Sequence, residues 1–248
     1  MPHDFLAISE SRTVYRVHRN AIQPDLMNEI VTHYDHAQQG EGDNYAKDET
    51  YTKMVYSDFF YEKNHRMRQV VDRMAPVGYR PLFDIFFETK ADVGKDHHWH
   101  LGTFSAFFME DPKMLTLWIP TRPANAEVGG RLICSRRQQL GDHLNRMLTH
   151  CVREDIQFSY ADMLATMTDV FEDGRLIDDF EVGDCLLFNS LIPHKGEGYH
   201  GEGSRSVYVV RYVPDDATFD LAVCQDFLAR NINPRLFERI LASARRTA

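Results

Sequence analysis

The chain has 248 residues, of which 43% are hydrophobic and 26% charged, and these proportions are typical of a globular protein with one sizeable core. Its net charge of −9 argues against a nucleic-acid partner, an anionic membrane surface and a strongly acidic carrier protein. No apolar run approaches the roughly 18 residues of a membrane span, and the first residues lack the pattern of a signal peptide. With four scattered cysteines, these features predict a cytoplasmic protein with reduced thiols.

The N-terminal third of the chain is predicted to be mainly helical. Pro24 and Asp25 favour a helix start, and the apolar residues that follow at helical spacing predict a helix over residues 24–37. Ser57 is a suitable cap for a second helix, which would end near Met74 because Pro76 follows.

From residue 81 onward the pattern becomes rich in strands. A helix is predicted over residues 138–151, and a last helix begins at Asn233 and Pro234. Together these elements predict one domain over residues 1–248: a helical region (1–80), a β core (81–219) with a helical insertion (about 136–180), and a C-terminal helix (220–248). The fold class is therefore mainly β, an antiparallel barrel or double sheet with helices outside. The predicted strands cover residues 82–88, 103–109, 114–119, 131–134, 185–188 and 206–213.

Two histidines at predicted strand edges, His100 and His194, suit a mononuclear iron centre. Such centres commonly use two histidines and one carboxylate, and the carboxylate would stand two residues after the first histidine. That position is Gly102. In a regular strand, His98, His100 and Gly102 would share one face, so His98 could supply a third nitrogen ligand or point at a substrate.

An arginine follows the second histidine at the start of the next predicted strand. Residues 196–201 match G-x-G-x-x-G by spacing, but a strand follows them where a dinucleotide fold needs a helix. The glycines therefore predict a hairpin turn. Such a hairpin would bring Arg205 beside His194, where its guanidinium could bind a carboxylate at two points.

These motifs, in this order and spacing, resemble the Fe(II)/2-oxoglutarate-dependent oxygenases, nearest the phytanoyl-CoA dioxygenase-related branch. The resemblance implies a double-stranded β-helix (jelly roll) and the cofactors Fe(II), 2-oxoglutarate and O2. It implies that His100 and His194 bind iron and that Arg205 holds the distal carboxylate of 2-oxoglutarate. Trp118 would lie beside the co-substrate. The pieces that carry it are Trp99-His100-Leu101-Gly102, Leu117-Trp118-Ile119-Pro120 with Gly129-Gly130-Arg131-Leu132, Gly183-Asp184 to His194, and Ser204-Arg205 to Asp216.

Gly102 is the departure from the hydroxylases of this superfamily. The radical halogenases resemble the chain there, because they carry Gly or Ala and chloride takes the vacated iron position. That resemblance implies chlorination of an unactivated C–H bond in a free small metabolite, with succinate and CO2 as co-products. Two alternatives remain: a hydroxylase whose iron is held by two histidines alone, and a metal-free barrel that acts as a binding module. The sequence gives no indication of the oligomeric state.

Overall fold

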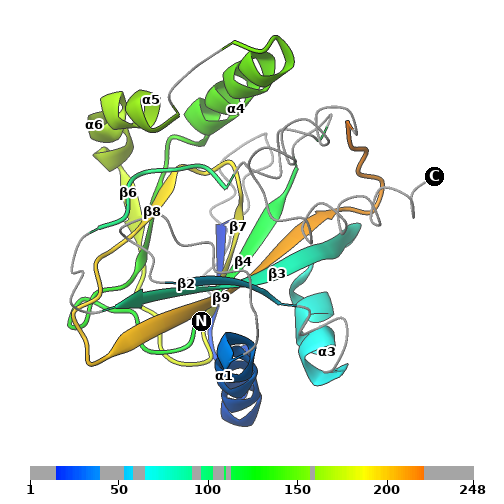
Figure 1. Ribbon diagram of the computed structural model, residues 1–248, viewed down its shortest axis with the longest axis vertical. Helices are drawn as coiled ribbons and strands as arrows, with labels where there is room; N and C mark the ends of the chain where they lie inside the picture. Colours follow the sequence, from blue (N-terminus) through cyan, green and yellow to red (C-terminus); the bar gives the residue numbers. More distant parts are fainter. Residues whose placement is uncertain are drawn as a thin grey trace.

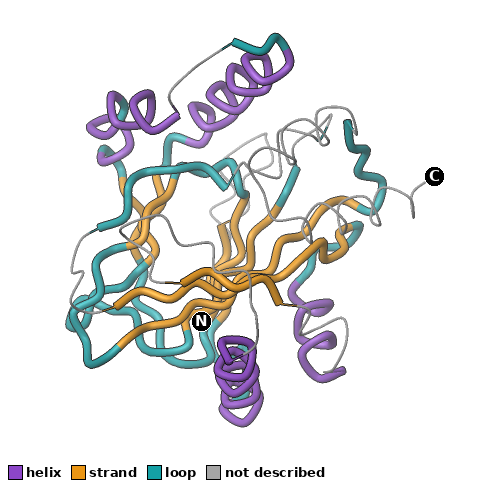
Figure 2. Tube along the Cα trace, in the orientation of Figure 1, coloured by secondary structure: helices purple, strands orange, loops and turns teal. Residues whose placement is uncertain are grey.

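The computed structural model describes residues 15–39, 53–57, 65–90, 96–102, 109, 113–156 and 160–220. These ranges form two antiparallel sheets with helices on both outer sides (Figures 1 and 2). The strands are β1 (Tyr15–His18), β2 (Lys53–Ser57), β3 (Tyr79–Lys90), β4 (Leu115–Pro120), β5 (Leu132–Ser135), β6 (Arg175–Ile177), β7 (Cys185–Asn189), β8 (His194–Gly196) and β9 (Ser204–Pro214). The helices are α1 (Pro24–Gln39), α3 (His65–Met74), α4 (Gln138–Arg153), α5 (Tyr160–Thr166) and α6 (Thr168–Glu172).

The larger sheet has six strands in the order β1-β7-β4-β9-β3-β2, and the smaller has three in the order β6-β5-β8. Strand β9 lies inside the larger sheet, between β3 and β4. Because successive side chains of a strand point to opposite faces, β9 serves two layers at once. Val207 and Val209 pack in the core that includes residues of the smaller sheet, whereas Tyr208 and Val210 pack under the helices.

Helices α1 and α3 cover the outer face of the larger sheet (Figure 1). Their apolar residues recur at helical spacing and meet the outward-facing residues of β4, β7 and β9. The buried helix residues are Leu26, Met27, Ile30, Met67, Val70, Val71 and Met74.

Helices α4 to α6 lie at the opposite end of the molecule and pack on the smaller sheet (Figure 1). Leu144, Leu148 and Phe171 are buried there against Ile133 of β5 and Trp99. The layers are therefore helix, six-stranded sheet, three-stranded sheet and helix. The core between the two sheets includes Trp118, Leu186 and Phe188, and it borders the functional pocket described below.

Most of the predicted elements agree with the structure, including the helix near residues 24–37, the helix near 138–151 and the strands near 82–88, 114–119, 131–134, 185–188 and 206–213. The helix predicted from near Ser57 to about Met74 is observed as α3, which ends at Met74, while residues 58–64 lie outside the described residues. Ser57 itself is the last residue of strand β2, which pairs with β3 and was not predicted. The predictions for residues 103–108 and for the C-terminal helix lie outside the described residues.

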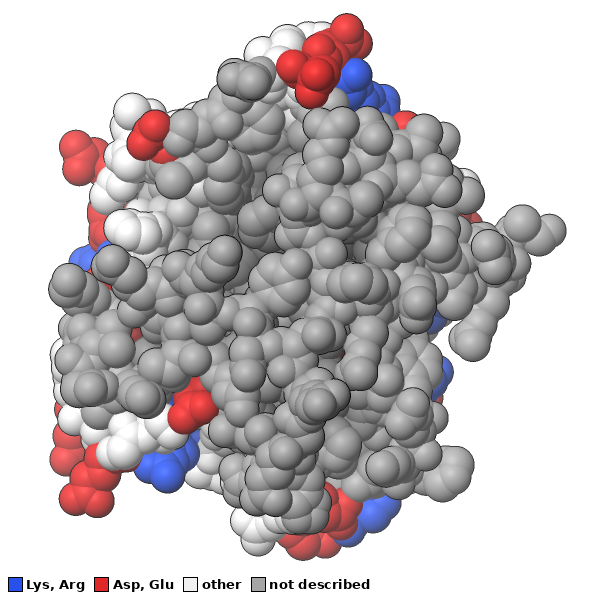
Figure 3. Space-filling model, viewed as in Figure 1, with Lys and Arg blue, Asp and Glu red and all other residues white. Residues whose placement is uncertain are grey.

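The mainly antiparallel architecture with outer helices is confirmed, whereas the jelly-roll strand order remains a prediction. Cys134, Cys151 and Cys185 are free thiols. Among the described helices, none is long and apolar enough to cross a membrane. Figure 3 shows acidic and basic side chains together around the periphery of one face.

Candidate active site

A pocket lies between the two sheets and receives side chains from both. The space between its lining atoms is about 520 Å³, a figure that includes open solvent at the mouth. Its lining is mostly apolar and aromatic, with two arginines and three histidines among the described residues. The lining residues are Phe87, His97, His100, Thr116, Trp118, Leu132, Phe188, His194, Gly196, Arg205, Val207, Val209 and Arg211.

His100 and His194 are brought together in this pocket although they lie far apart in the sequence. The backbone N–H of each donates to the carbonyl of the other, and both hydrogen bonds measure 2.9 Å. Their ring centroids are 4.3 Å apart. The isolated bridge between the two residues thus places the imidazoles side by side at the edge of β8.

One ring nitrogen of each histidine contacts a backbone carbonyl. His100 Nδ1 contacts the carbonyl of His98 at 2.9 Å, and His194 Nδ1 contacts the carbonyl of Ile192 at 2.7 Å. A carbonyl oxygen only accepts, so each Nδ1 carries a proton. Burial, followed by the charge of His100, lowers the pKa of His194 well below its ordinary value. Two imidazoles whose rings are oriented through Nδ1 fit a divalent ion such as Fe(II).

Gly102 lies against an arginine that the sequence analysis did not single out. A Cβ atom added at Gly102 would lie 2.8 Å from Arg211 Nη1 and 3.1 Å from the carbonyl oxygen of Ser190. The space beside Gly102 is therefore bordered by a cation. A guanidinium has donors and no acceptor, so Arg211 cannot replace the missing carboxylate as a metal ligand.

Arg211 is held in place by two buried hydroxyls. Its Nη1 donates to Thr116 Oγ1 and, at 3.4 Å, to Ser190 Oγ. These two hydroxyl oxygens are themselves 2.8 Å apart. The sequence carried a usable signal for Arg211: it stands six residues after Arg205 in one strand, and an even spacing places both side chains on one face.

Arg205 and Trp118 lie in the same pocket as the histidines. Arg205 is 3% exposed, its Nη1 donates to the carbonyl of Gly130, and its Cζ lies 5.8 Å from the Trp118 ring centroid. Gly130 has a φ of +74°, and a Cβ added there would come within 3.0 Å of Arg205 Nε. Glycine at this position thus leaves room for the guanidinium.

Two geometric expectations were wrong. Residues 96–102 do not form a regular strand, and His98 is exposed while His100 lines the pocket. The turn after His194 is not a hairpin, because β8 and β9 belong to different sheets. Arg205 reaches the histidines by facing them across the gap between the sheets. Within the ranges that the structure describes, no cluster of three or more His, Cys, Asp or Glu side chains could hold a metal.

Comparison with known proteins places this fold among solved structures, while no family model and no curated protein matches the chain. The carbocyclase SnoK, a non-haem α-ketoglutarate-dependent enzyme of nogalamycin biosynthesis, aligns with a TM-score of 0.63 at 15% identity, over 88% of this chain and 87% of SnoK. EctD from S. alaskensis aligns with a TM-score of 0.58 at 12% identity, over 84% and 75% of the two chains.

HygX from Streptomyces hygroscopicus, solved with nickel and 2-oxoglutarate, aligns with a TM-score of 0.52 at 14% identity, over 82% of this chain and 83% of HygX. At these identities the likeness establishes a shared fold. The chain thus has the fold of a group of structures that includes non-haem, α-ketoglutarate-dependent enzymes.

Proposed function

We propose that the protein is an Fe(II)/2-oxoglutarate-dependent oxidoreductase that chlorinates an unactivated C–H bond of a free small metabolite. The observation that carries this proposal is the pocket itself: two imidazoles side by side whose Nδ1 atoms contact backbone carbonyls, and next to them a glycine bordered by a guanidinium. We also propose that residues 1–248 form one domain built on a double-stranded β-helix.

In this proposal each pocket residue has a defined task. His100 and His194 hold the metal, and their Nδ1 protons remain on backbone carbonyls so that the rings keep their orientation. Arg205, buried over Trp118, binds the distal carboxylate of 2-oxoglutarate with a charge-assisted pair. Bound Fe(II) would activate O2 and couple the decarboxylation of 2-oxoglutarate to removal of a substrate hydrogen atom.

The positive charge of Arg211 beside Gly102 favours an anion next to the metal. A carboxylate at residue 102 would contribute one negative charge, whereas this chain has a glycine there with Arg211 next to it. A chloride ion restores that charge and contacts the guanidinium. The overall reaction consumes the substrate C–H group, chloride, a proton, 2-oxoglutarate and O2, and it releases the chlorinated product, succinate, CO2 and water.

The test begins with the anaerobic complex of the protein with Fe(II) and 2-oxoglutarate. We expect a visible absorption band that chloride shifts, and succinate formation when O2 and a substrate are added. Arg205→Ala should raise the 2-oxoglutarate requirement sharply, because it removes one partner of a buried charged pair. Arg205→Lys, which keeps the charge but loses the two-point geometry, is the matched control.

The outcomes separate the three candidate functions. A band that is indifferent to chloride, together with a hydroxylated product, would identify a two-histidine hydroxylase. Failure to bind Fe(II) and 2-oxoglutarate at all would favour a metal-free binding module and would refute the proposal.

A further inference from the structure

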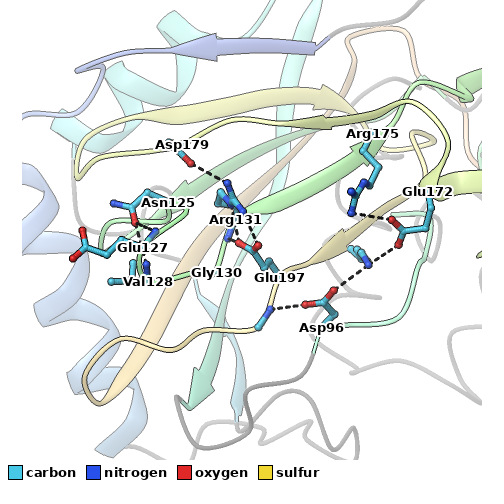
Figure 4. A network of polar contacts seen from close by, with 12 residues as sticks. Asp96, Asn125, Glu127, Val128, Gly130, Arg131, Glu172, Arg175, Asp179 and Glu197 are labelled. Atoms are coloured by element: carbon cyan, nitrogen blue, oxygen red, sulfur yellow. Dashed lines mark hydrogen bonds and ion pairs between the residues drawn. The ribbon is translucent and has the colours of Figure 1, made fainter.

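A cluster of charged side chains joins β8, α6 and the segment before His100, and Figure 4 shows two of its members, Asp96 and Glu172. Lys195 is 8% exposed, and its Nζ donates to Asp96 Oδ2 at 3.0 Å and to Glu172 Oε1 at 2.6 Å. Lys195 follows His194 directly in β8. Because neighbouring residues of a strand point to opposite faces, His194 faces the pocket while Lys195 faces away from it.

Asp96 ties the segment that carries the first histidine to the strand that carries the second. Its Oδ1 accepts a hydrogen bond of 3.0 Å from the backbone N–H of Gly198, and the next residue, His97, donates its N–H to the carbonyl of Gly196 at 2.8 Å. Residues 96–100 have no regular strand pairing, so these contacts and the His100–His194 bridge are what align them with β8.

Glu172 extends the cluster to α6. Its Oε1 also accepts from Trp99 Nε1 at 3.0 Å, and its Oε2 lies 3.1 Å from Arg175 Nη1. The Trp99 ring packs 5.5 Å from Phe171 of the same helix, and the Lys195 ammonium lies 5.4 Å from the Trp99 ring centroid. The helical insertion therefore contacts the residue next to His100 from behind.

The charges of this cluster support one another. Burial is the largest single influence on Glu172 and opposes its ionisation, but the hydrogen bonds from Lys195 and Trp99 and the charges of Lys195 and Arg175 together lower the pKa of that carboxyl. Burial also opposes ionisation of Asp96, and the Gly198 N–H and Lys195 together lower its pKa. All three side chains are thus charged at neutral pH. Partly buried ion pairs of this kind stabilise a fold only modestly, but their directional hydrogen bonds can fix the register of the segments they join.

We propose that Lys195 is a positioning residue: its ion pairs with Asp96 and Glu172 hold the two histidines at the separation and orientation that a metal ion requires. Helix α6 thereby supports the metal site from outside the pocket. The inference rests on the proposed function, since it assumes that His100 and His194 bind a metal. Changes to residues that orient metal ligands typically lower metal affinity by about 10–100-fold.

The test compares two neighbouring isosteric substitutions in the full-length protein. Glu172→Gln removes a charge that contacts Lys195, whereas Asp173→Asn removes the charge of an exposed ion pair with Arg137. We expect Glu172→Gln to weaken Zn(II) binding by about tenfold or more and to shift the absorption bands of the Co(II) complex. Asp173→Asn should change neither. Lys195→Met should have the larger effect, and Lys195→Arg should restore most of the lost affinity.

The results distinguish a failure of this inference from a failure of the proposed function. A wild-type protein that binds no divalent metal overturns both. If the wild type binds Zn(II) and Glu172→Gln binds it equally well, or if Asp173→Asn loses as much affinity, the positioning role of Lys195 is refuted. A lower unfolding temperature with unchanged metal affinity and Co(II) spectrum also refutes it. Should Lys195→Met fail to fold, Glu172→Gln and Asp96→Asn decide the question.

Discussion

If Arg211 were absent, replacing Gly102 by aspartate would supply the third ligand of a 2-His-1-carboxylate site. In this protein, however, the new Cβ would lie 2.8 Å from Arg211 Nη1, closer than side-chain carbons approach other atoms. Either the guanidinium retreats or the new carboxylate pairs with it. We therefore expect Asp at this position to bind Arg211 in competition with the metal.

The magnitude follows from the strength of a charge-assisted hydrogen bond, about 1.5–3 kcal/mol. A free energy of about 1.4 kcal/mol corresponds to a factor of ten. A carboxylate paired with Arg211 should therefore bind the metal roughly 10–150-fold more weakly than an unpaired carboxylate would. In the Arg211→Met background the carboxylate is released. Thr116 and Ser190 keep their mutual hydrogen bond of 2.8 Å there, so the loss of the guanidinium does not orphan either hydroxyl.

The assay is a double-mutant cycle of Zn(II) dissociation constants for the wild type, Gly102→Asp, Arg211→Met and the double variant. Gly102→Ala is the steric control, because it displaces the guanidinium without adding charge. We expect the double variant to bind metal most tightly and Gly102→Asp to fall well short of it. If Gly102→Asp raised Zn(II) affinity equally in the wild-type and Arg211→Met backgrounds, Arg211 would not pair with the new carboxylate. That result would refute the proposal that Arg211 favours an anion beside Gly102.

Two further predictions concern a glycine and a histidine. Gly130→Ala and Gly78→Ala should each lower the unfolding free energy by about 1–2 kcal/mol, because both residues have positive φ. Only the alanine at residue 130 would place its Cβ against Arg205, so only Gly130→Ala should also weaken 2-oxoglutarate binding, measured by calorimetry. Burial and then Arg16 lower the pKa of His18, so the unfolded chain takes up this proton at a higher pH, near 6.5, than the folded chain. Between about pH 7.5 and about pH 5.5 the wild type should therefore lose more unfolding free energy than His18→Gln; an equal loss would contradict the assigned burial.

Local patterns in the sequence were sufficient for most of the secondary structure. Short apolar runs predicted β4, β7 and β9, and helical spacing predicted α1 and α4. Local patterns did not reveal β2, which pairs with β3 along the edge of the larger sheet. Spacing alone also misjudged the orientation of His98, because residues 96–102 have no regular strand pairing and are joined to β8 by the backbone hydrogen bonds of His97 and His100.

The two histidines, Gly102 and Arg205 could be named in advance because their order and spacing are written in the chain. Three features depended on contacts between segments far apart in sequence: the guanidinium of Arg211 against Gly102, the room that Gly130 leaves for Arg205, and the support of the histidines by α6. Sequence spacing determines which face of a strand a side chain occupies. What that side chain meets across the gap between two sheets depends on how the sheets pack, and that packing sets the charge beside the proposed metal site.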